Sequence, residues 1–216
     1  MIVDERMKAY INSLDSGNTP ILDIIEQEAI DTYVPIIKKE TQSLLKVLLA
    51  MKNPINILEV GTAVGFSAIL MGEYTNDSCK ITTIEKYEKR IPIAKDNFKR
   101  ANMSHKITLL EGDALDIMKD LDAQYDMIFM DAAKGQYIHF LPQVRRLLGD
   151  GGVLISDNVM QDGDIIESRY AIIRRNRTIH SRMREYLYEL THASDLNTTI
   201  LPIGDGVTIS VINKKK

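Results

Sequence analysis

Hydrophobic and polar positions divide the 216-residue chain into a helical beginning and an alternating remainder. Ahead of residue 53, apolar residues recur three or four positions apart, a spacing that predicts amphipathic helices at about 3–14, 21–33 and 41–51. Further along, helical stretches alternate with short apolar runs at 57–60, 81–84, 107–110, 127–130 and 153–155. This alternation predicts parallel strands connected by right-handed helical crossovers.

The closing part of the chain has the pattern of a β-hairpin. Residues 198–212 contain two β-forming runs on either side of a Gly204-Asp-Gly turn. We therefore expect a single α/β domain over 1–216, in which helices at 1–52 precede a Rossmann-like core at 53–216. Its sheet should be mostly parallel with a terminal antiparallel hairpin, and helices should cover both faces.

Composition excludes several classes of protein. The formal charge of −3 argues against a surface built entirely for nucleic acid, although it is compatible with a local basic patch. Cys79 is the only cysteine, so neither a disulfide framework nor a thiolate metal cluster is expected. The charged first residues do not fit a signal peptide, and no apolar run reaches the roughly 20 residues of a membrane span. We expect a soluble cytoplasmic protein without a membrane partner.

A glycine turn follows the first apolar run, in the segment Ile57-Leu-Glu-Val-Gly-Thr-Ala-Val-Gly-Phe-Ser. Gly61 and Gly65 would let the backbone approach a ligand between a strand and a helix N-terminus, which is how an α/β sheet receives a nucleotide. Glu85 closes the next apolar run, where a carboxylate can accept hydrogen bonds from both ribose hydroxyls. The alternative is a glycine turn without a ligand.

The spacing of these glycines distinguishes two kinds of nucleotide ligand. A dinucleotide fingerprint, Gly-x-Gly-x-x-Gly, is interrupted here by Ala63 and Phe66. The observed Glu59-x-Gly61-x-x-x-Gly65 resembles motif I of the S-adenosylmethionine-dependent methyltransferases instead. That cofactor contains a ribose and an adenine but no phosphate, so it needs no tight turn around a pyrophosphate.

Acidic and amide side chains follow the fourth and fifth expected strands. Asp131 ends one apolar run, and Asp157-Asn158 ends the next. Ligands in open parallel sheets lie beside the carboxyl ends of the strands, so these three side chains should converge. Two carboxylates and an amide oxygen suit a hard cation such as Mg²⁺, Mn²⁺ or Ca²⁺. The alternative is that Asp157-Asn158 only turns the chain.

Two further positions are candidate site residues because each follows an expected strand. Lys134 follows Asp131 closely, and a lysine near a divalent cation can act as a base or stabilise a developing oxyanion. Its alternative is an ordinary surface lysine. Asp113 and Ala114 follow the third strand, where an adenine would lie. Asp113 also fits a helix N-cap, and both roles can hold together.

Taken together, these motifs resemble the cation-dependent O-methyltransferases of the catechol and caffeoyl-CoA type. The resemblance extends over residues 20–213 and includes Lys39-Glu-Thr-Gln42 before the first strand and Leu201-Pro-Ile-Gly-Asp-Gly-Val-Thr208 in the hairpin. It implies a class I methyltransferase fold with a seven-stranded sheet, and S-adenosylmethionine and Mg²⁺ as cofactors. It also implies a homodimer, with the N-terminal helices as the candidate interface.

The resemblance assigns roles residue by residue. Asp131, Asp157 and Asn158 would bind the metal. Lys134 and Asp131 would be the catalytic residues, with Lys134 serving the reacting hydroxyl. The residues that would bind the cofactor are Ile36, Glu59, Gly61, Ser67, Glu85, Asp113, Ala114 and Asp131.

Arginine is concentrated beyond the presumed metal site. From Ser168 to Arg184 the chain contains His180 and no acid, together with Arg169, Arg174, Arg175, Arg177, Arg182 and Arg184 itself. RNA phosphates and unstacked bases suit arginine through charge, forked hydrogen bonds and stacking. We therefore expect RNA binding by Arg174, Arg175, Arg177 and Arg182. The alternatives are a solvated helix face, ion pairs between subunits, or a grip on the phosphates of a coenzyme A thioester.

The segment Arg174-Arg-Asn-Arg-Thr-Ile-His180 resembles that of bacterial tRNA 5-hydroxyuridine methyltransferases in the same family. This implies O-methylation of 5-hydroxyuridine at the wobble position of a tRNA anticodon loop, giving 5-methoxyuridine. The hydroxyl and the C4 carbonyl of that base form a vicinal oxygen pair like that of a catechol. The alternative is a small-molecule O-methyltransferase acting on catechol or caffeoyl-CoA-like hydroxyls. Ala63 stands where animal catechol enzymes have a tyrosine, which disfavours the catechol class.

Overall fold

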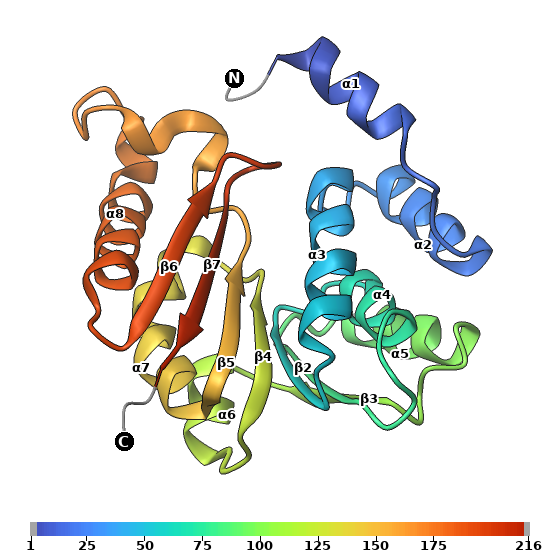
Figure 1. Ribbon diagram of the computed structural model, residues 1–216. Coiled ribbons are helices and arrows are strands. Elements are labelled where there is room, and N and C mark those ends of the chain that lie inside the picture. Colours follow the sequence, from blue (N-terminus) through green and yellow to red (C-terminus); the bar gives the residue numbers. More distant parts are fainter. Residues whose placement is uncertain (1–3, 214–216) are drawn as a thin grey trace.

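A seven-stranded sheet in the order β3-β2-β1-β4-β5-β7-β6 forms the centre of the structure, a computed structural model that describes residues 4–213 (Figure 1). Neighbours among β1 to β5 are parallel, whereas β7 is antiparallel to both β5 and β6. The predicted mostly parallel sheet with a terminal antiparallel hairpin is confirmed. The strands are β1 (Asn56–Val60), β2 (Lys80–Glu85), β3 (Ile107–Glu111), β4 (Tyr125–Met130), β5 (Leu148–Ser156), β6 (Leu196–Leu201) and β7 (Val207–Ile212).

Helices cover both faces of this sheet, as the alternating pattern predicted (Figure 1). The α-helices are α1 (Glu5–Ser13), α2 (Pro20–Asp31), α3 (Lys39–Lys52), α4 (Phe66–Glu73), α5 (Ile91–Arg100), α6 (Ala114–Asp120), α7 (Tyr137–Leu147) and α8 (Arg177–His192). Short 3-10 helices are η1 (Lys134–Gln136), η2 (Gln161–Ile166) and η3 (Arg174–Asn176). Within the described part of the chain, none of the helices combines the length and apolarity needed to cross a membrane.

Two apolar clusters, one on each face of the sheet, form the core. Consecutive residues of a strand belong to opposite clusters: Leu58 packs on the side of α7 and α8, and Ile57 on the side of α3 and α4. In β4, the side chains of Met127-Ile128-Phe129-Met130 are all 0% exposed. A strand buried on both faces has a continuous apolar run instead of an alternating one, which explains its sequence pattern.

β1 lies between β2 and β4, so the sheet grows in opposite directions from this strand. In open α/β sheets such a reversal leaves a crevice outside the carboxyl ends of the central strands, and ligands bind there. The segments that leave β1 and β4 meet at this point, where the backbone N–H of Asp131 donates to the carbonyl oxygen of Val60 at 3.0 Å. The topology therefore brings the glycine turn next to Asp131.

β5 begins earlier than the sequence predicted. The apolar run 153–155 is only the later part of a strand that spans Leu148–Ser156. Glycines between 149 and 152 conceal the first part, because glycine more often marks a turn than a strand. The register with β4 also shifts between Tyr125 and Met127, an irregularity that an apolar pattern does not reveal.

The helices predicted ahead of the first strand are confirmed, although their packing differs. The expected start of the first helix at residue 3 lies outside the described residues. α2 and α3 are packed through buried side chains such as Leu22 and Leu45. α1 has no buried residue and lies apart from the core (Figure 1). A hydrogen bond of 3.0 Å from Asn12 Nδ2 to Glu40 Oε1 links it to α3.

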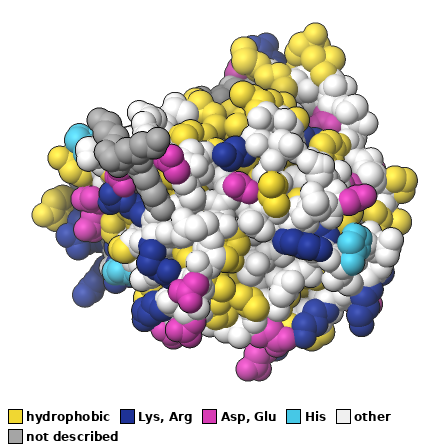
Figure 2. Space-filling view, turned by 60° about the horizontal axis from the view of Figure 1, so that its bottom comes forward, with side chains coloured by type: hydrophobic (Ala, Val, Ile, Leu, Met, Phe, Trp, Pro, Cys, Tyr) yellow, Lys and Arg dark blue, Asp and Glu magenta, His cyan; other side chains and the backbone are white. Residues whose placement is uncertain are grey.

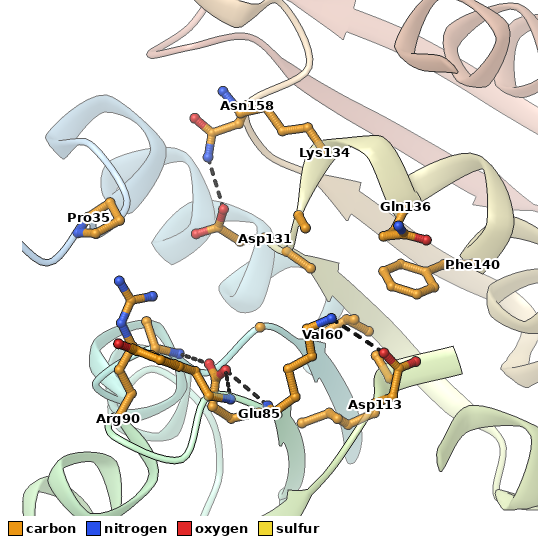
Figure 3. Close-up of a pocket in the computed structure, with 18 of the residues that line it drawn as sticks. Pro35, Val60, Glu85, Arg90, Asp113, Asp131, Lys134, Gln136, Phe140 and Asn158 are labelled. Atoms are coloured by element: carbon orange, nitrogen blue, oxygen red, sulfur yellow. Dashed lines mark hydrogen bonds and ion pairs between the residues drawn. The ribbon is translucent and has the colours of Figure 1, made fainter. Parts of the chain in front are cut away.

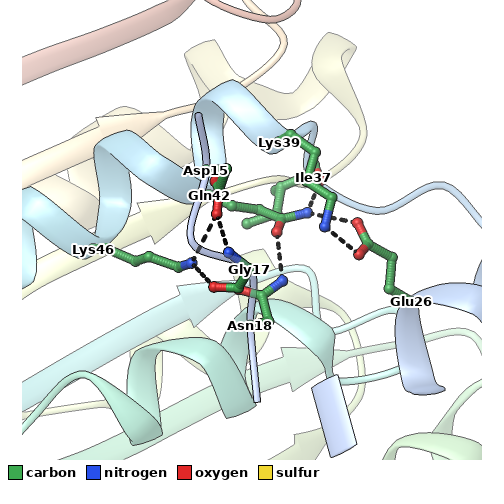
Figure 4. Close-up of polar contacts among 8 residues, drawn as sticks. All are labelled: Asp15, Gly17, Asn18, Glu26, Ile37, Lys39, Gln42 and Lys46. Carbon is green, nitrogen blue, oxygen red and sulfur yellow. Dashed lines mark hydrogen bonds and ion pairs between the residues drawn. The ribbon is translucent and has the colours of Figure 1, made fainter. Parts of the chain in front are cut away.

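Gln42 connects the N-terminal helices to the segment that lies over the sheet crevice (Figure 4). Its side chain is buried in α3, and its Nε2 donates to Glu26 Oε1 and to the carbonyl oxygen of Ile37, each at 3.0 Å. Its Oε1 accepts a hydrogen bond from Asn18 Nδ2 at 3.0 Å. A buried amide with these partners fixes the linker between α2 and α3, and this linker contains Ile36.

Candidate active site

A cavity of about 570 Å³ opens beside the carboxyl ends of β1, β2, β3 and β4 (Figure 3). Glu59, Ser67 and Asp157 are not among the described residues that line it. The predicted site residues that the structure brings to its wall are Ile36, Gly61, Glu85, Asp113, Ala114, Asp131, Lys134 and Asn158. Residues from six separate parts of the chain thus meet in one space.

Glycine is required at positions 61 and 65 because the backbone packs closely there. Gly61 has a φ of +106°, and a Cβ would lie 2.1 Å from the carbonyl oxygen of Asp131. Gly65 has a φ of +87° at the start of α4, and a Cβ would lie 2.5 Å from Cε1 of Phe98. No L side chain fits either position without displacement. The glycine turn therefore has a packing role in addition to its place at the cavity.

The Glu85 carboxylate is held at the cavity by backbone donors (Figure 3). Its Oε2 accepts from the N–H of Ala63 at 2.8 Å. Its Oε1 accepts from the N–H groups of Tyr87 at 2.8 Å and Lys86 at 3.0 Å. An ionised carboxylate has about four acceptor positions, so these three bonds leave capacity for a ribose hydroxyl.

Glu59 and Ser67 lie beneath the cavity wall. The Glu59 side chain is 0% exposed and accepts hydrogen bonds from the hydroxyls of Ser67 and Thr83. Burial raises the pKa of its carboxyl to about 7, although both hydrogen bonds oppose the shift. These three side chains connect β1, α4 and β2 and so support the glycine turn from below. A direct contact of Glu59 or Ser67 with the cofactor stays a prediction.

Asp113 caps a helix and lines the cavity at the same time. Its Oδ1 accepts a hydrogen bond from the N–H of Leu115 at 3.0 Å and so caps α6. Its Oδ2 pairs with Lys86 Nζ at 3.4 Å. The cap fixes a carboxylate beside Ala114 at the cavity wall, which is compatible with the predicted adenine contact.

Asp131 lies at the end of β4, and Asp157 and Asn158 lie at the end of the neighbouring strand β5. Asn158 Nδ2 donates to Asp131 Oδ1 at 2.9 Å (Figure 3). Thr41 Oγ1, from α3, donates to Asp157 Oδ1 at 3.5 Å. Asn158 also has a φ of +63°, so the predicted alternative, a turn at this position, holds together with these contacts.

The electrostatics of this cluster fit a bound cation. Burial and, next, the charge of Asp131 raise the pKa of the Asp157 carboxyl to about 7. Burial also raises the pKa of Asp131, against the lowering effect of its hydrogen bond from Asn158. A hard divalent cation would offset both effects, and rotation of the Asn158 amide would present its oxygen as a third ligand. No group of three His, Cys, Asp or Glu side chains suited to a metal occurs in residues 4–213, so this amide is an essential member of the set.

Tyr137 organises the acidic cluster, and sequence reasoning missed it. Its buried hydroxyl, at the start of α7, lies 3.1 Å from the carbonyl oxygen of Met130 and 3.0 Å from that of Asp157. It therefore joins the carboxyl ends of β4 and β5. Burial raises the pKa of Tyr137 well above its usual range, so the hydroxyl keeps its proton and donates it. A tyrosine at a helix start is common in cores, and no local signal marked this one.

Lys134 lines the cavity on a segment that α8 supports. It begins η1, directly before Gly135, and its positive charge lowers the pKa of Asp131. Arg182 Nη1 donates to the carbonyl oxygen of Gly135 at 3.1 Å. A residue predicted to bind RNA thus holds the segment that carries the predicted catalytic lysine.

The four arginines predicted to bind RNA divide into two pairs. Arg174 and Arg175 are exposed in η3. Arg177 and Arg182 are partly buried and donate to backbone carbonyl oxygens, Arg177 through Nε to Ile172 at 3.0 Å. The second pair stabilises the local backbone, and a contact of any of the four with RNA stays a prediction.

An ion pair between Lys38 and Asp205 closes one side of the cavity, and the sequence did not indicate it. Lys38 precedes α3, and Asp205 lies in the turn between β6 and β7. Both residues also line a second cavity of about 770 Å³, bounded by α1, α3 and that turn. Its apolar lining residues are Ile11, Leu14, Leu44, Val47, Pro202 and Ile203.

Comparison with known proteins identifies the family. Residues 13–214 match the family described as O-methyltransferase. The chain is 30% identical over 179 residues to a caffeoyl-CoA O-methyltransferase of Medicago sativa, which covers 76% of this chain and 70% of that protein. A Staphylococcus aureus crystal structure of the caffeoyl-CoA O-methyltransferase type matches with a TM-score of 0.89 and 33% identity, over 97% of this chain and 100% of the other.

The chain therefore belongs to the O-methyltransferase family, as its motifs predicted. A further structural match is the S-adenosylhomocysteine-bound methyltransferase PaMTH1 of Podospora anserina. Its TM-score is 0.86 at 25% identity, over 97% of this chain and 95% of that one. The predicted Rossmann-like methyltransferase fold is confirmed by these matches together with the sheet order.

Proposed function

We propose that this O-methyltransferase transfers a methyl group from S-adenosylmethionine to the hydroxyl of 5-hydroxyuridine in a tRNA anticodon loop, with Mg²⁺ at the site. The observation that carries the RNA assignment is the acid-free segment 169–184 beside the cavity, in which Arg174 and Arg175 are exposed. On the face at the bottom of Figure 1, by contrast, acidic and basic side chains are interspersed (Figure 2). A local basic segment on a protein of net charge −3 favours a polyanionic partner.

Binding of the methyl donor is supported by the wall of the first cavity. Glu85 holds a carboxylate ready for a ribose diol at the end of β2, and Asp113 and Ala114 border the neighbouring space for an adenine. The S-adenosylhomocysteine bound to the Podospora anserina neighbour supports the same class of ligand here.

Mg²⁺ would be held by Asp131, Asp157 and Asn158. When bound, the cation supplies two open positions for a vicinal oxygen pair and makes the coordinated hydroxyl more acidic. Tyr137 keeps the carboxyl ends of β4 and β5 in register. Lys134 would take the proton of the acceptor hydroxyl or stabilise the oxyanion that develops there, and the fixed positions of acceptor and donor would supply much of the rate.

Mass spectrometry of tRNA nucleosides from cells with and without the gene tests the proposal. We expect loss of 5-methoxyuridine and accumulation of 5-hydroxyuridine in the cells that lack it. Return of the gene should restore the modification, whereas the Asp157→Ala variant should not. An unchanged nucleoside profile would contradict the tRNA substrate while leaving the O-methyltransferase family unaffected.

A small molecule with vicinal hydroxyls is the second candidate acceptor. The second cavity, which shares Lys38 and Asp205 with the first and has a wall that is apolar in part, favours it. A flat apolar group attached to the reacting ring would find space there. Efficient methylation of caffeoyl or catechol acceptors, together with no turnover of tRNA, would select this function.

A further inference from the structure

His180 is buried in α8 without a hydrogen-bond partner for either ring nitrogen. The side chain is 2% exposed, and among the described residues neither Nδ1 nor Nε2 is paired. An unpaired polar group in a protein interior is unfavourable, and most such groups are paired with protein, water or a ligand. The His180 ring therefore marks a place where a ligand would complete the structure.

His180 is one of the residues that line a cavity of about 380 Å³, separate from the two cavities described above, although both of its ring nitrogens are buried. Arg169 and Arg184 contribute guanidinium groups to its wall, and Glu167 contributes one carboxylate. The charged wall is therefore positive on balance. Ser168 and Ser181 add hydroxyl groups to the same wall. A positive cavity with several hydrogen-bond donors is suited to an anion.

Two of the donors are held in place by the backbone of the same region. Arg184 Nη1 donates to the carbonyl oxygen of Ile165 in η2 at 3.1 Å, which fixes one guanidinium against the wall. Ser168 Oγ accepts from the N–H of Tyr170 at 3.3 Å, which leaves the hydroxyl able to donate its own proton. These contacts orient donors before any ligand arrives.

We propose that this cavity binds a phosphate group of the methyl acceptor. Phosphate oxygens would accept from the guanidinium groups and the serine hydroxyls, and a rotation of the His180 ring, whose nitrogens are buried in this structure, would bring an N–H to the same ligand. The same part of α8 reaches the catalytic cavity, because Arg182 donates to the carbonyl oxygen of Gly135, the neighbour of Lys134. In this arrangement the acceptor molecule would extend from Lys134 to the cavity at His180.

The identity of that molecule rests on the proposed function. In an anticodon loop the group is a backbone phosphodiester, and in an acyl-coenzyme A acceptor it is a phosphate of the coenzyme. Both offer the same chemistry to His180 and Arg169. The experiment therefore compares the two sources and inorganic phosphate on the intact protein.

The first measurement follows the imidazole resonances of His180 by ¹⁵N-edited NMR, assigned by their loss in His180→Phe. Inorganic phosphate, an anticodon stem–loop RNA and coenzyme A are titrated separately. We expect a saturable shift with phosphate and with the RNA. A shift with phosphate and coenzyme A but not with RNA keeps the phosphate site and contradicts the tRNA substrate. No shift with any of the three overturns the site.

The second measurement is the affinity of the stem–loop RNA at several salt concentrations. Arg169→Gln changes an exposed side chain, so it tests the site even if His180→Phe lowers stability. Each variant should weaken binding roughly three- to tenfold. Arg169→Gln should also reduce the slope of log K against log salt by about 0.7–0.9, the loss of one charged phosphate contact.

Lys99→Gln is the matched control, since it removes one exposed positive charge from α5, on the opposite side of the structure from α8 (Figure 1). Its salt slope should equal that of the unchanged protein. Equal slopes for Arg169→Gln and Lys99→Gln would overturn the site, provided that the unchanged protein binds the RNA. Absence of RNA binding by the unchanged protein contradicts the proposed function, and the site then rests on the phosphate and coenzyme A titrations.

Discussion

The hydroxyl of Tyr137 lies 3.0 Å from the carbonyl oxygen of Asp157, and the same hydroxyl lies 3.1 Å from that of Met130. One buried proton donor therefore joins the ends of the two strands that carry the acidic cluster. The distance between Asp131 and the 157–158 pair depends on these strand ends. The geometry of the candidate metal site is thus set by a residue that is not itself a ligand.

Tyr137→Phe should lower methyl transfer more than it lowers stability. Loss of the hydroxyl leaves two buried carbonyl oxygens with one donor fewer, at a cost of about 1–2 kcal/mol in the free energy of unfolding. Displacement of the ligands should reduce kcat by about 10-fold or more, as for other supports of metal ligands. Urea unfolding and a methyl-transfer assay measure the two effects.

Tyr186→Phe is the matched control for that variant. Tyr186 is equally buried, packs edge-on against Tyr137 at 5.5 Å between ring centroids, and has its hydroxyl 2.6 Å from Ser156 Oγ. It should lose similar stability while kcat changes little. Equal losses of activity in the two variants would contradict a positioning role for Tyr137.

Asp157→Asn should abolish methyl transfer while leaving binding of S-adenosylhomocysteine nearly unchanged. A metal ion stabilises transition-state charge by several kcal/mol, so a loss of at least about 100-fold in kcat is expected. Removal of divalent cations with a chelator should produce the same loss in the unchanged protein, and Mg²⁺ should reverse it. Calorimetry with S-adenosylhomocysteine checks the second half of the prediction.

Asp116→Asn serves as the control, because Asp116 is an exposed acid on α6. Its activity should stay within about twofold of the unchanged protein, as for most surface substitutions. Full activity of Asp157→Asn, or full activity in the presence of the chelator, would be evidence against a metal mechanism.

Glu59 should make the protein less stable as pH rises from about 4.5 to about 7. Its carboxyl has a pKa of about 7 in the folded state against an ordinary value of 4.5, so in this interval the folded state holds a proton that the unfolded state has lost. The free energy of unfolding therefore falls across the interval, by up to about 3 kcal/mol, and this contribution is constant above it. Full stabilisation from this group is present only below the unfolded pKa.

Glu59→Gln removes this titration. At pH 5 the variant should resemble the unchanged protein, and at pH 8 it should be more stable than the unchanged protein by up to about 3 kcal/mol. Urea unfolding at both pH values gives the comparison, with the exposed Glu88→Gln as the control. A stability difference between Glu59→Gln and the unchanged protein that does not vary with pH would refute the assignment.

Gly61→Ala should be far more damaging than Gly17→Ala. Both glycines have positive φ, +106° and +83°, so both substitutions strain the backbone by about 1 kcal/mol or more. A Cβ at Gly61 would also lie 2.1 Å from the carbonyl oxygen of Asp131, whereas a Cβ at Gly17 meets nothing within 4 Å. We expect Gly61→Ala to cost at least about 3 kcal/mol and to disrupt the cavity. Equal unfolding temperatures for the two variants would contradict this prediction. They would show that the loops after β1 and β4 can move apart to accommodate a Cβ without a loss of stability.

The predicted homodimer should depend on α1. Four large apolar side chains in α1 and at its C-terminal end are more than half exposed, namely Met7 58%, Tyr10 65%, Ile11 53% and Leu14 67%. Light scattering should give twice the mass of one chain, and Ile11→Glu with Leu14→Glu should convert the protein to monomers. Ile166→Glu, at a position 82% exposed outside α1, should leave the dimer intact. A monomeric unchanged protein contradicts the prediction.

The sequence by itself determined the class of fold, the order of its elements and most of the cavity wall. Helix and strand periodicities depend on residues two to four positions apart. They can therefore be recognised in the sequence without knowing which distant segment packs against them. The glycine turn, Glu85, Asp113 and Asp131 could be located because each ends or follows a strand, and parallel strands place their carboxyl ends at one edge. Asp113 even combines a local cap with its place in the wall.

Only the tertiary structure decided which residues support that wall. Thr41 and Asp157 are 116 positions apart, and Lys38 and Asp205 are 167 apart, so no local pattern could pair them. Only the structure shows that the Glu59 side chain is fully buried and does not line the cavity. Burial depends on how distant segments pack, and the same residue types in another packing would face water.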